Sequence, residues 1–224
     1  MNVTRLNNTI VAHNQAANGV DVAGNFVDQG NNLIGIADGS TGFTNSTLVG
    51  TSAAPIYPLL APLGNNGGLT QTRALLPGSP GIDAGNSSVL SDQRGIGRVN
   101  APDIGAFESR GFVLTAQGGG GQTTEVTTAF GSPLAVAIAS PFGEPVDGGQ
   151  INFVAPTTGS SAVFSSNPLA IPITAGAAQI SLSANGVEGT YAVSATGNGL
   201  SPVVFTLTNT LPPTIPPPSI PPTP

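Results

Sequence analysis

Short runs in which apolar and polar residues alternate fill the chain from residue 111 to residue 209. Glycine, proline and asparagine separate these runs at intervals of about ten residues, which is the strand spacing of an all-β sandwich. Because side chains along a strand alternate between two faces, one apolar set should point into a shared core. The residues expected to point inward are Leu134, Val136, Ile138, Ile151, Phe153, Tyr191, Val193, Phe205 and Leu207.

The segment 1–57 shows a pattern that repeats along the chain instead. The run LNNTIVAHN at 6–14 can be laid over GNNLIGIAD at 30–38, which pairs Asn7 with Asn31, Asn8 with Asn32 and Ile10 with Ile34. A shift of 24 residues is typical of one coil of a parallel β-helix, in which equal positions stack at about 4.8 Å. Stacked isoleucines would fill the core, and stacked asparagines would share amide hydrogen bonds at the corners.

Two further runs extend this pattern. STLVG at 46–50 repeats the NLIG pattern at a shorter spacing, and GVDVAG at 19–24 is expected to form another short face between corners. We therefore interpret residues 1–57 as partial coils of a right-handed parallel β-helix.

Residues 58–110 are apolar but interrupted by turns, as in TQTRALLPGSPGIDAG at 70–85. Prolines remove backbone donors, so this stretch cannot continue a strand ladder. A β-helix leaves an unpaired edge at its end, which invites pairing with another strand. We expect the segment to follow the last coil, close that edge and lead into the sandwich. Its apolar and turn positions include Pro77, Pro80, Ile82 and Phe107.

The same segment holds the densest group of charged residues, namely Asp83, Asp92, Arg94, Arg98, Asp103 and Glu108. A pair of carboxylates could cleave glycosides or polysaccharides. Alternatively, Asx-turns and arginine–carboxylate pairs could hold an irregular backbone. The second interpretation is favoured, with Asp83 bonding to nearby backbone N–H groups and with Arg94 and Arg98 neutralising Asp83, Asp103 or Glu108. These charged residues and the four apolar ones are the predicted structural cap.

Other candidate groups lack partners for chemistry. His13 is the single histidine, and Ser79 lies in PGSPG rather than in a nucleophile elbow. Asp21, Asp28 and Asp38 are too scattered for a calcium array, and the run Gly118–Gly121 lacks the lysine of a phosphate loop. We predict no catalytic, cofactor-binding or metal-binding residue and no cofactor.

Composition narrows the class of protein. Charged residues are 7% of the chain and the net charge is −6, with arginine as the only strongly basic residue type. Clustered basic residues are needed for nucleic acids and anionic membrane surfaces, so neither partner is expected. The chain has no cysteine and no long apolar run that could insert into a membrane. A signal peptide is not recognisable, so an export signal is expected upstream.

The segment 211–224, LPPTIPPPSIPPTP, is rich in proline. This composition favours an extended polyproline II spacer rather than a packed domain.

Residues 58–108 resemble a known family. The series PGSPGIDAG, then DQRG, then DIGAFE is similar to the end of the β-helix region in large bacterial surface proteins of the choice-of-anchor Q type. The usual histidine of TQTH is Arg73 here, and the usual SPAIDAG is SPGIDAG. The resemblance implies a β-helix end and attaches no catalytic role to these positions.

Residues 111–210 resemble bacterial Ig-like modules of the invasin type. The resemblance is carried by the pattern at Pro145–Pro156 and by the closing run FTLTNT, which begins at Phe205. It implies only an Ig-like sandwich, because the Cys–Trp–Cys core of antibody domains is missing. The expected domains are thus coils at 1–57, a cap at 58–110, an Ig-like sandwich at 111–210 and a tail at 211–224.

These features predict a non-catalytic structural or adhesive segment of a secreted or cell-surface bacterial protein. Its expected partners are surface glycans, other cell-surface proteins and upstream coils of a longer parent chain. One alternative is the C-terminal part of a β-helix carbohydrate-active enzyme whose catalytic coils lie upstream. Another is a glycan-binding module.

Overall fold

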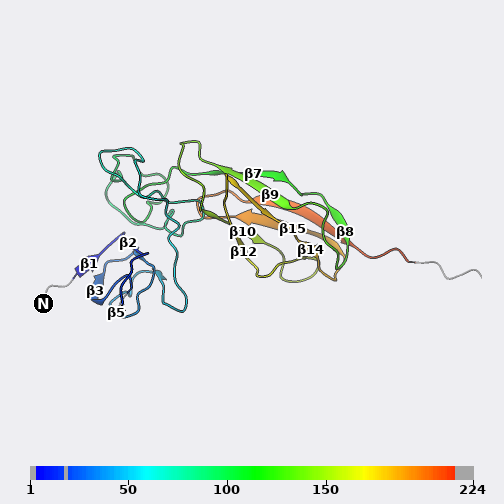
Figure 1. Cartoon of the computed structure of the whole chain (residues 1–224), viewed down its shortest axis with the longest axis horizontal. Helices are drawn as coiled ribbons and strands as arrows, with labels where there is room; N and C mark the ends of the chain where they lie inside the picture. Colours follow the sequence, from blue (N-terminus) through cyan, green and yellow to red (C-terminus); the bar gives the residue numbers. More distant parts are fainter. Residues whose placement is uncertain (1–3, 18–19, 215–224) are drawn as a thin grey trace, which may run out of the picture.

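The computed structural model describes residues 4–17 and 20–214, and these residues form β-strands but no helix (Figure 1). The prediction of an all-β protein is confirmed for this part of the chain. A membrane-spanning helix is accordingly not found among the described residues.

Six short strands near the N-terminus form two parallel sheets. One sheet has the order β1-β3-β5 and the other the order β2-β4-β6, so that successive passes of the chain lie side by side. The strands are β1 (Thr4–Leu6), β2 (Ile10–Val11), β3 (Gly24–Asp28), β4 (Leu33–Ile34), β5 (Ser40–Thr41) and β6 (Leu48–Val49). Leu33 and Ile34 are fully buried on the central strand of the second sheet.

The spacing of these strands is shorter than the predicted shift. Thr4 pairs with Phe26, a shift of 22 (26 − 4), and Ile10 pairs with Leu33, a shift of 23 (33 − 10). The predicted pairing of Ile10 with Ile34 is therefore wrong by one position. A one-residue slip reverses which side chains share a face, so the correction matters for the core.

Of the other details of the coil prediction, one is confirmed and one is wrong. The shorter repeat at Leu48 is confirmed, because Leu48 pairs with Leu33. The run expected at 19–24 is not a strand between residues 20 and 23, while Gly19 lies outside the described residues. The strand begins at Gly24 instead and has the sequence GNFVD.

Asn8 and Asn31 occupy equivalent corners of successive passes. Both have left-handed backbone, with φ of 51° and 53°, a conformation that asparagine tolerates better than most residues. The predicted pairs, Asn7 with Asn31 and Asn8 with Asn32, share no amide–amide hydrogen bond among the described residues. Asn8 Nδ2 donates to the Asp103 carbonyl (3.1 Å), and Asn31 Nδ2 donates to the Ala84 carbonyl (2.9 Å).

Residues 58–110 contain no extended strand. They hold only isolated bridges, which join Leu60 to Leu75, Gly64 to Thr72 and Ser91 to Gly97. We expected this segment to close the edge beyond the last coil. Its hydrogen bonds instead reach Asn8 and Asn31 at the first and second corners, and none among the described residues reaches β5 or β6. The segment thus packs beside the strands, as Figure 1 also shows.

Ten strands follow in residues 113–210. A five-stranded sheet has the order β12-β10-β15-β16-β8, and a three-stranded sheet has the order β13-β9-β7. A two-stranded pair joins β11 to β14. The strands are β7 (Val113–Gly118), β8 (Thr123–Glu125), β9 (Leu134–Ala139), β10 (Gln150–Val154), β11 (Ala162–Val163), β12 (Leu169–Pro172), β13 (Ala177–Ile180), β14 (Ser183–Ala184), β15 (Gly189–Thr196) and β16 (Val203–Thr210).

The nine residues predicted to point inward are all buried in one apolar cluster between these sheets. The strand β12 was missed, because Pro168 precedes its run LAIP and Pro172 ends it, and proline weakens a strand prediction. Here the strand is an edge strand, and within the described part of the chain it pairs with β10 alone; an edge tolerates proline.

Residues 113–210 form the second region, and residues 58–110 form the irregular segment. The apolar cluster of the second region extends into the irregular segment. Leu75 and Ile82 belong to it, and the half-buried Ile10 and Leu60 pack against it. Three backbone regions far apart in sequence therefore share one core. Of the proline-rich tail, residues 211–214 have no regular structure, and residues 215–224 lie outside the described part.

Candidate functional site

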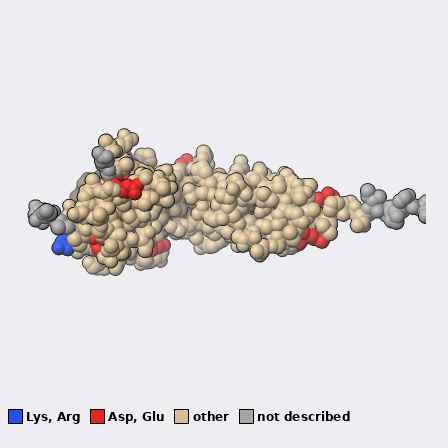
Figure 2. All heavy atoms as spheres, turned by 90° about the horizontal axis from the view of Figure 1, so that it is seen from below, with Lys and Arg blue, Asp and Glu red and all other residues tan. Residues whose placement is uncertain are grey.

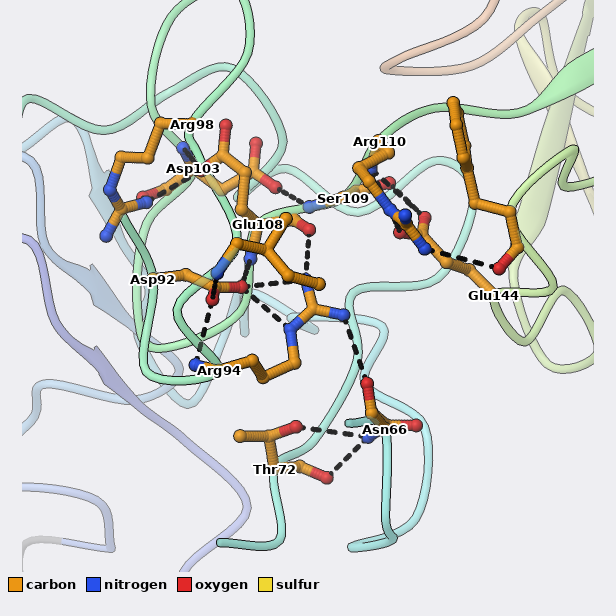
Figure 3. A network of polar contacts seen from close by, with 12 residues as sticks. Asn66, Thr72, Asp92, Arg94, Arg98, Asp103, Glu108, Ser109, Arg110 and Glu144 are labelled. Atoms are coloured by element: carbon orange, nitrogen blue, oxygen red, sulfur yellow. Dashed lines mark hydrogen bonds and ion pairs between the residues drawn. The ribbon is translucent and has the colours of Figure 1, made fainter. Parts of the chain in front are cut away.

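Five of the six predicted charged residues lie together where the irregular segment meets the second region (Figure 3), namely Asp92, Arg94, Arg98, Asp103 and Glu108. Asp92 and Arg94 form an ion pair of 2.7 Å, and their side chains are 0% and 2% exposed. The Asp92 carboxylate also accepts hydrogen bonds from the backbone N–H groups of Ile96 and Glu108. Burial raises the pKa of Asp92, but the N–H of Glu108 and the Arg94 side chain outweigh it and lower the pKa.

Arg94 also contacts an aromatic ring and a backbone carbonyl. Its guanidinium carbon lies 3.5 Å from the centre of the Phe107 ring, a cation–π contact. Its Nη2 donates to the Glu108 carbonyl at 2.5 Å. The pair with Asp92 corrects the expectation that Arg94 neutralises Asp83, Asp103 or Glu108.

Arg98 and Glu108 form the second ion pair, at 2.7 Å. The fully buried Glu108 carboxylate also accepts from the N–H groups of Val99 (2.9 Å) and Asp103 (3.0 Å). Arg98 Nη1 and Nη2 reach the carbonyls of Asp103 and Gly105. One carboxylate and one guanidinium therefore hold a turn that has no ladder of its own.

Asp103 lies in the centre of this network and is 1% exposed. Its two oxygens accept from the N–H groups of Asp83 (2.8 Å) and Ser109 (2.6 Å). Burial, with the nearby charges of Glu108 and Asp83, raises its pKa to about 7. No arginine forms an ion pair with Asp83 or Asp103 among the described residues.

Asp83 has a role different from the one predicted. Its backbone is left-handed (φ 54°) and its N–H donates to Asp103. Burial and the charge of Glu108 raise the pKa of its partly exposed carboxyl. The side chain was expected to bond to nearby backbone N–H groups, but no such bond is present among the described residues.

Two apolar members of the predicted cap, Pro77 and Ile82, contact the second region. The Pro77 carbonyl accepts from Gln150 N–H at 2.9 Å. Ile82 is 7% exposed and lies against Gly199, where an added Cβ would come within 3.0 Å of it. Pro80 begins the half-buried turn that leads to Asp83. Phe107 is buried beneath Arg94.

The contact between the irregular segment and the second region, the junction, is completed by Glu144. The sequence analysis did not identify this residue. Its carboxylate accepts from Ser109 Oγ (2.9 Å) and from Arg110 N–H (3.0 Å), and it pairs with Arg110 Nε at 3.5 Å. The Arg110 guanidinium lies over the Phe142 ring at 4.4 Å. A lone glutamate between glycine and proline gives no sequence signal, because its partners lie 34 and 35 residues earlier.

Asp28 is the second group that sequence reasoning missed. Its oxygens accept from Gly30 N–H (3.0 Å), Asn32 Nδ2 (2.7 Å), Asn45 N–H (2.7 Å) and Ser46 Oγ (2.7 Å). Burial raises the pKa, but the hydrogen bond from Ser46 and those from the other donors lower it to about 2. Gly30, two positions after Asp28, is typical of an Asx-turn. It does not predict the hydrogen bonds that Asp28 accepts from the next coil.

The described residues contain no group of three or more histidine, aspartate or glutamate side chains that could hold a metal ion. His13 lies at a bend with φ of 63°, and its ring is 6.3 Å from that of Tyr57. Ser79 is buried in its turn, with Oγ donating to the Pro58 carbonyl. The carboxylates of Asp92, Asp103, Glu108 and Glu144 all bind backbone amides, so this network is suited to fixing backbone.

This chain shows little similarity to known proteins. No family model matches the sequence, and no curated protein is similar to it. Domains 4 and 5 of the S-layer protein SbsC align with 43% of this chain and 50% of their own, at 15% identity and a TM-score of 0.30. The Arg-specific cysteine proteinase gingipain R aligns with 53% of this chain and 21% of its own, at 9% identity and a TM-score of 0.24. These scores are too low to bear on function.

Proposed function

We propose that this chain is a non-catalytic structural segment of a secreted or cell-surface bacterial protein. In this proposal residues 1–57 are coils of a right-handed parallel β-helix, and residues 111–210 form an Ig-like sandwich. The parallel pairing of β1 with β3 and of β2 with β4 supports the first part. Two sheets around one apolar core support the second. The choice-of-anchor Q and invasin-type resemblances stay within this proposal.

The observation that carries the proposal is the use made of the buried carboxylates. Asp92, Asp103, Glu108 and Glu144 are each less than a tenth exposed and accept backbone N–H bonds. A catalytic acid must instead meet its substrate within hydrogen-bond reach. Carboxylates held in this way lock the irregular segment and attach it to the second region. The product is a rigid connector between two β regions.

The surface of the second region fits the same role. After Arg110 the chain has no lysine or arginine, and its four acidic residues are Glu125, Glu144, Asp147 and Glu188. Figure 2 shows that acidic atoms lie toward its ends on the face seen, and that uncharged side chains cover its middle. Such a surface suits contact with neutral glycans or other surface proteins better than contact with nucleic acid.

The test has two parts. Antibodies against the second region should label intact cells that produce the protein, and external protease should remove the label. Incubation with polygalacturonate and other acidic glycans should give no unsaturated products. Such products, lost on substitution of Asp83, would overturn the proposal in favour of a β-helix enzyme. A label that appears only after lysis would overturn the surface location.

A further inference from the structure

Two of the five arginines have no acidic partner among the described residues. Arg94, Arg98 and Arg110 pair with Asp92, Glu108 and Glu144. Arg5 and Arg73 form no ion pair in the described part of the chain. Arg5 is exposed on β1, at the outer edge of its sheet. Arg73 is exposed too, but it lines a hollow.

The hollow lies between the first coil and the irregular segment and has a volume of about 400 Å³. Asn8, Thr9 and Ile10 form one wall, and the other wall is lined by Leu60, Arg73, Gly105 and Ala106. This volume is within the range of roughly 300–1,000 Å³ that small-molecule sites occupy. Isoleucine, leucine and alanine side chains make much of the lining apolar, which is also usual for such sites.

Among the described residues that line the hollow, the Arg73 guanidinium is the main source of free hydrogen-bond donors. Asn8 uses both ends of its carboxamide, with one hydrogen bond from Nδ2 to the Asp103 carbonyl and one from Asn86 N–H to Oδ1. Thr9 Oγ1 donates to the Asn7 carbonyl. Arg73 donates one hydrogen bond, from Nη1 to the Ala61 carbonyl at 3.2 Å. Its other donors have no partner among the described residues.

We propose that this hollow binds a small carboxylate with an apolar face, and that Arg73 holds the carboxylate. A guanidinium presents parallel N–H donors that match the two oxygens of a carboxylate. Ile10 and Leu60 would cover the apolar face of the ligand. A sugar acid and a hydrocarbon ring acid share this chemistry. The inference goes beyond the proposed surface role and does not depend on it.

Calorimetric titration of the full chain tests the proposal with two matched pairs of probes. Cyclohexanecarboxylate is compared with cyclohexanemethanol, and galacturonate with galactose. At least one acid should bind while its neutral counterpart does not, and added salt should weaken the binding. The acid that binds more tightly identifies the source of the carboxylate.

Two variants separate the site from general charge effects. Arg73→Gln keeps an N–H donor for Ala61 but removes the charge, and should weaken binding about tenfold or more. Arg5→Gln removes the same charge outside the hollow and should bind as the unmodified chain does. Thermal melting confirms that both variants are folded. Equal affinity for acid and neutral probes, unchanged affinity in Arg73→Gln, or no binding at about 10 mM would overturn the proposal.

Discussion

Asp28 joins separate stretches of backbone through the two oxygens of one carboxylate. It lies at the end of β3 and accepts from Gly30 in its own turn and from Asn45 and Ser46 at the corner between β5 and β6 in the next pass. Buried donors that lose their acceptor keep the full cost of being removed from water. This single residue therefore fixes the stacking of two coils.

Substitution of Asp28 by Asn should destabilise the fold by about 2 kcal/mol or more, because an amide cannot accept on both sides. The pKa of Asp28 is lowered from 3.8 to about 2, so its contribution is present above pH 3.8 and is lost as the pH falls toward 2. Urea unfolding at several pH values measures this. Glu125→Gln, at an exposed acid, is the control, and equal acid profiles for both variants would contradict the prediction.

Asp103 should show the opposite dependence on pH. Its folded pKa of about 7 lies above the ordinary value of 3.8, so its contribution is complete below pH 3.8 and is lost as the pH rises through 7. Asp103→Asn has no such titration, and its loss of stability relative to the unmodified chain should therefore shrink between pH 4 and pH 8. Chemical unfolding across this range checks the trend. A loss that grows with pH would contradict it.

At the scale of elements, the irregular segment takes its shape from side chains rather than from a ladder. Two ion pairs, Asp92–Arg94 and Arg98–Glu108, supplement the backbone hydrogen bonds of its isolated bridges. Buried pairs of this kind offset a large desolvation cost only when further bonds satisfy them, and here backbone N–H groups do so. The segment can thus contact both the coils and the second region.

Ile82 shows how this segment is tied to the second region. It belongs to the apolar cluster between the two sheets and contacts the loop at Gly199. Ile82→Asp places an unpaired carboxyl in that core and should cost about 3–5 kcal/mol. We expect the second region to lose stability together with the segment, as chymotryptic digestion followed by mass spectrometry would show, because residues 113–210 contain phenylalanine, tyrosine and leucine sites for chymotrypsin but no site for trypsin. Val89→Asp, at an exposed apolar residue, serves as control.

At the scale of the whole molecule, the junction decides the shape. Glu144 holds Ser109 and Arg110, and Gln150 bonds to Pro77, so two β regions are joined by more than a linker. Figure 1 shows the second region extending away from the coils along the long axis of the molecule. In the proposed structural role, this junction would hold the two β regions at a set spacing.

Glu144→Gln should loosen the junction, because the amide has one acceptor oxygen where the carboxylate has two, and because it no longer pairs with the Arg110 guanidinium. We expect a loss of about 1–3 kcal/mol and a broader distribution of distances in small-angle X-ray scattering. Glu188→Gln, at an exposed acid in the same region, should leave both unchanged. An unaltered scattering curve for Glu144→Gln would show that the shared apolar core alone fixes the junction.

The sequence by itself determined the all-β class and the inward faces of the second region. Alternation along a strand is local, so Leu134 and Val136 or Phe205 and Leu207 reveal their common face without any knowledge of the partner strand. The repeat near Asn8 and Asn31 was visible for the same reason, although its register was one position off. Turn residues likewise marked residues 58–110 as irregular.

Only the tertiary structure decided where that segment packs and what its charges do. Asn8 bonds to Asp103 across 95 residues, and Ser109 bonds to Glu144 across 35. Composition could show that carboxylates and arginines were present, but their pairing depends on how loops without a period come together. Local patterns fix which face of a strand is apolar, whereas contacts between irregular loops follow from the packing of the whole chain.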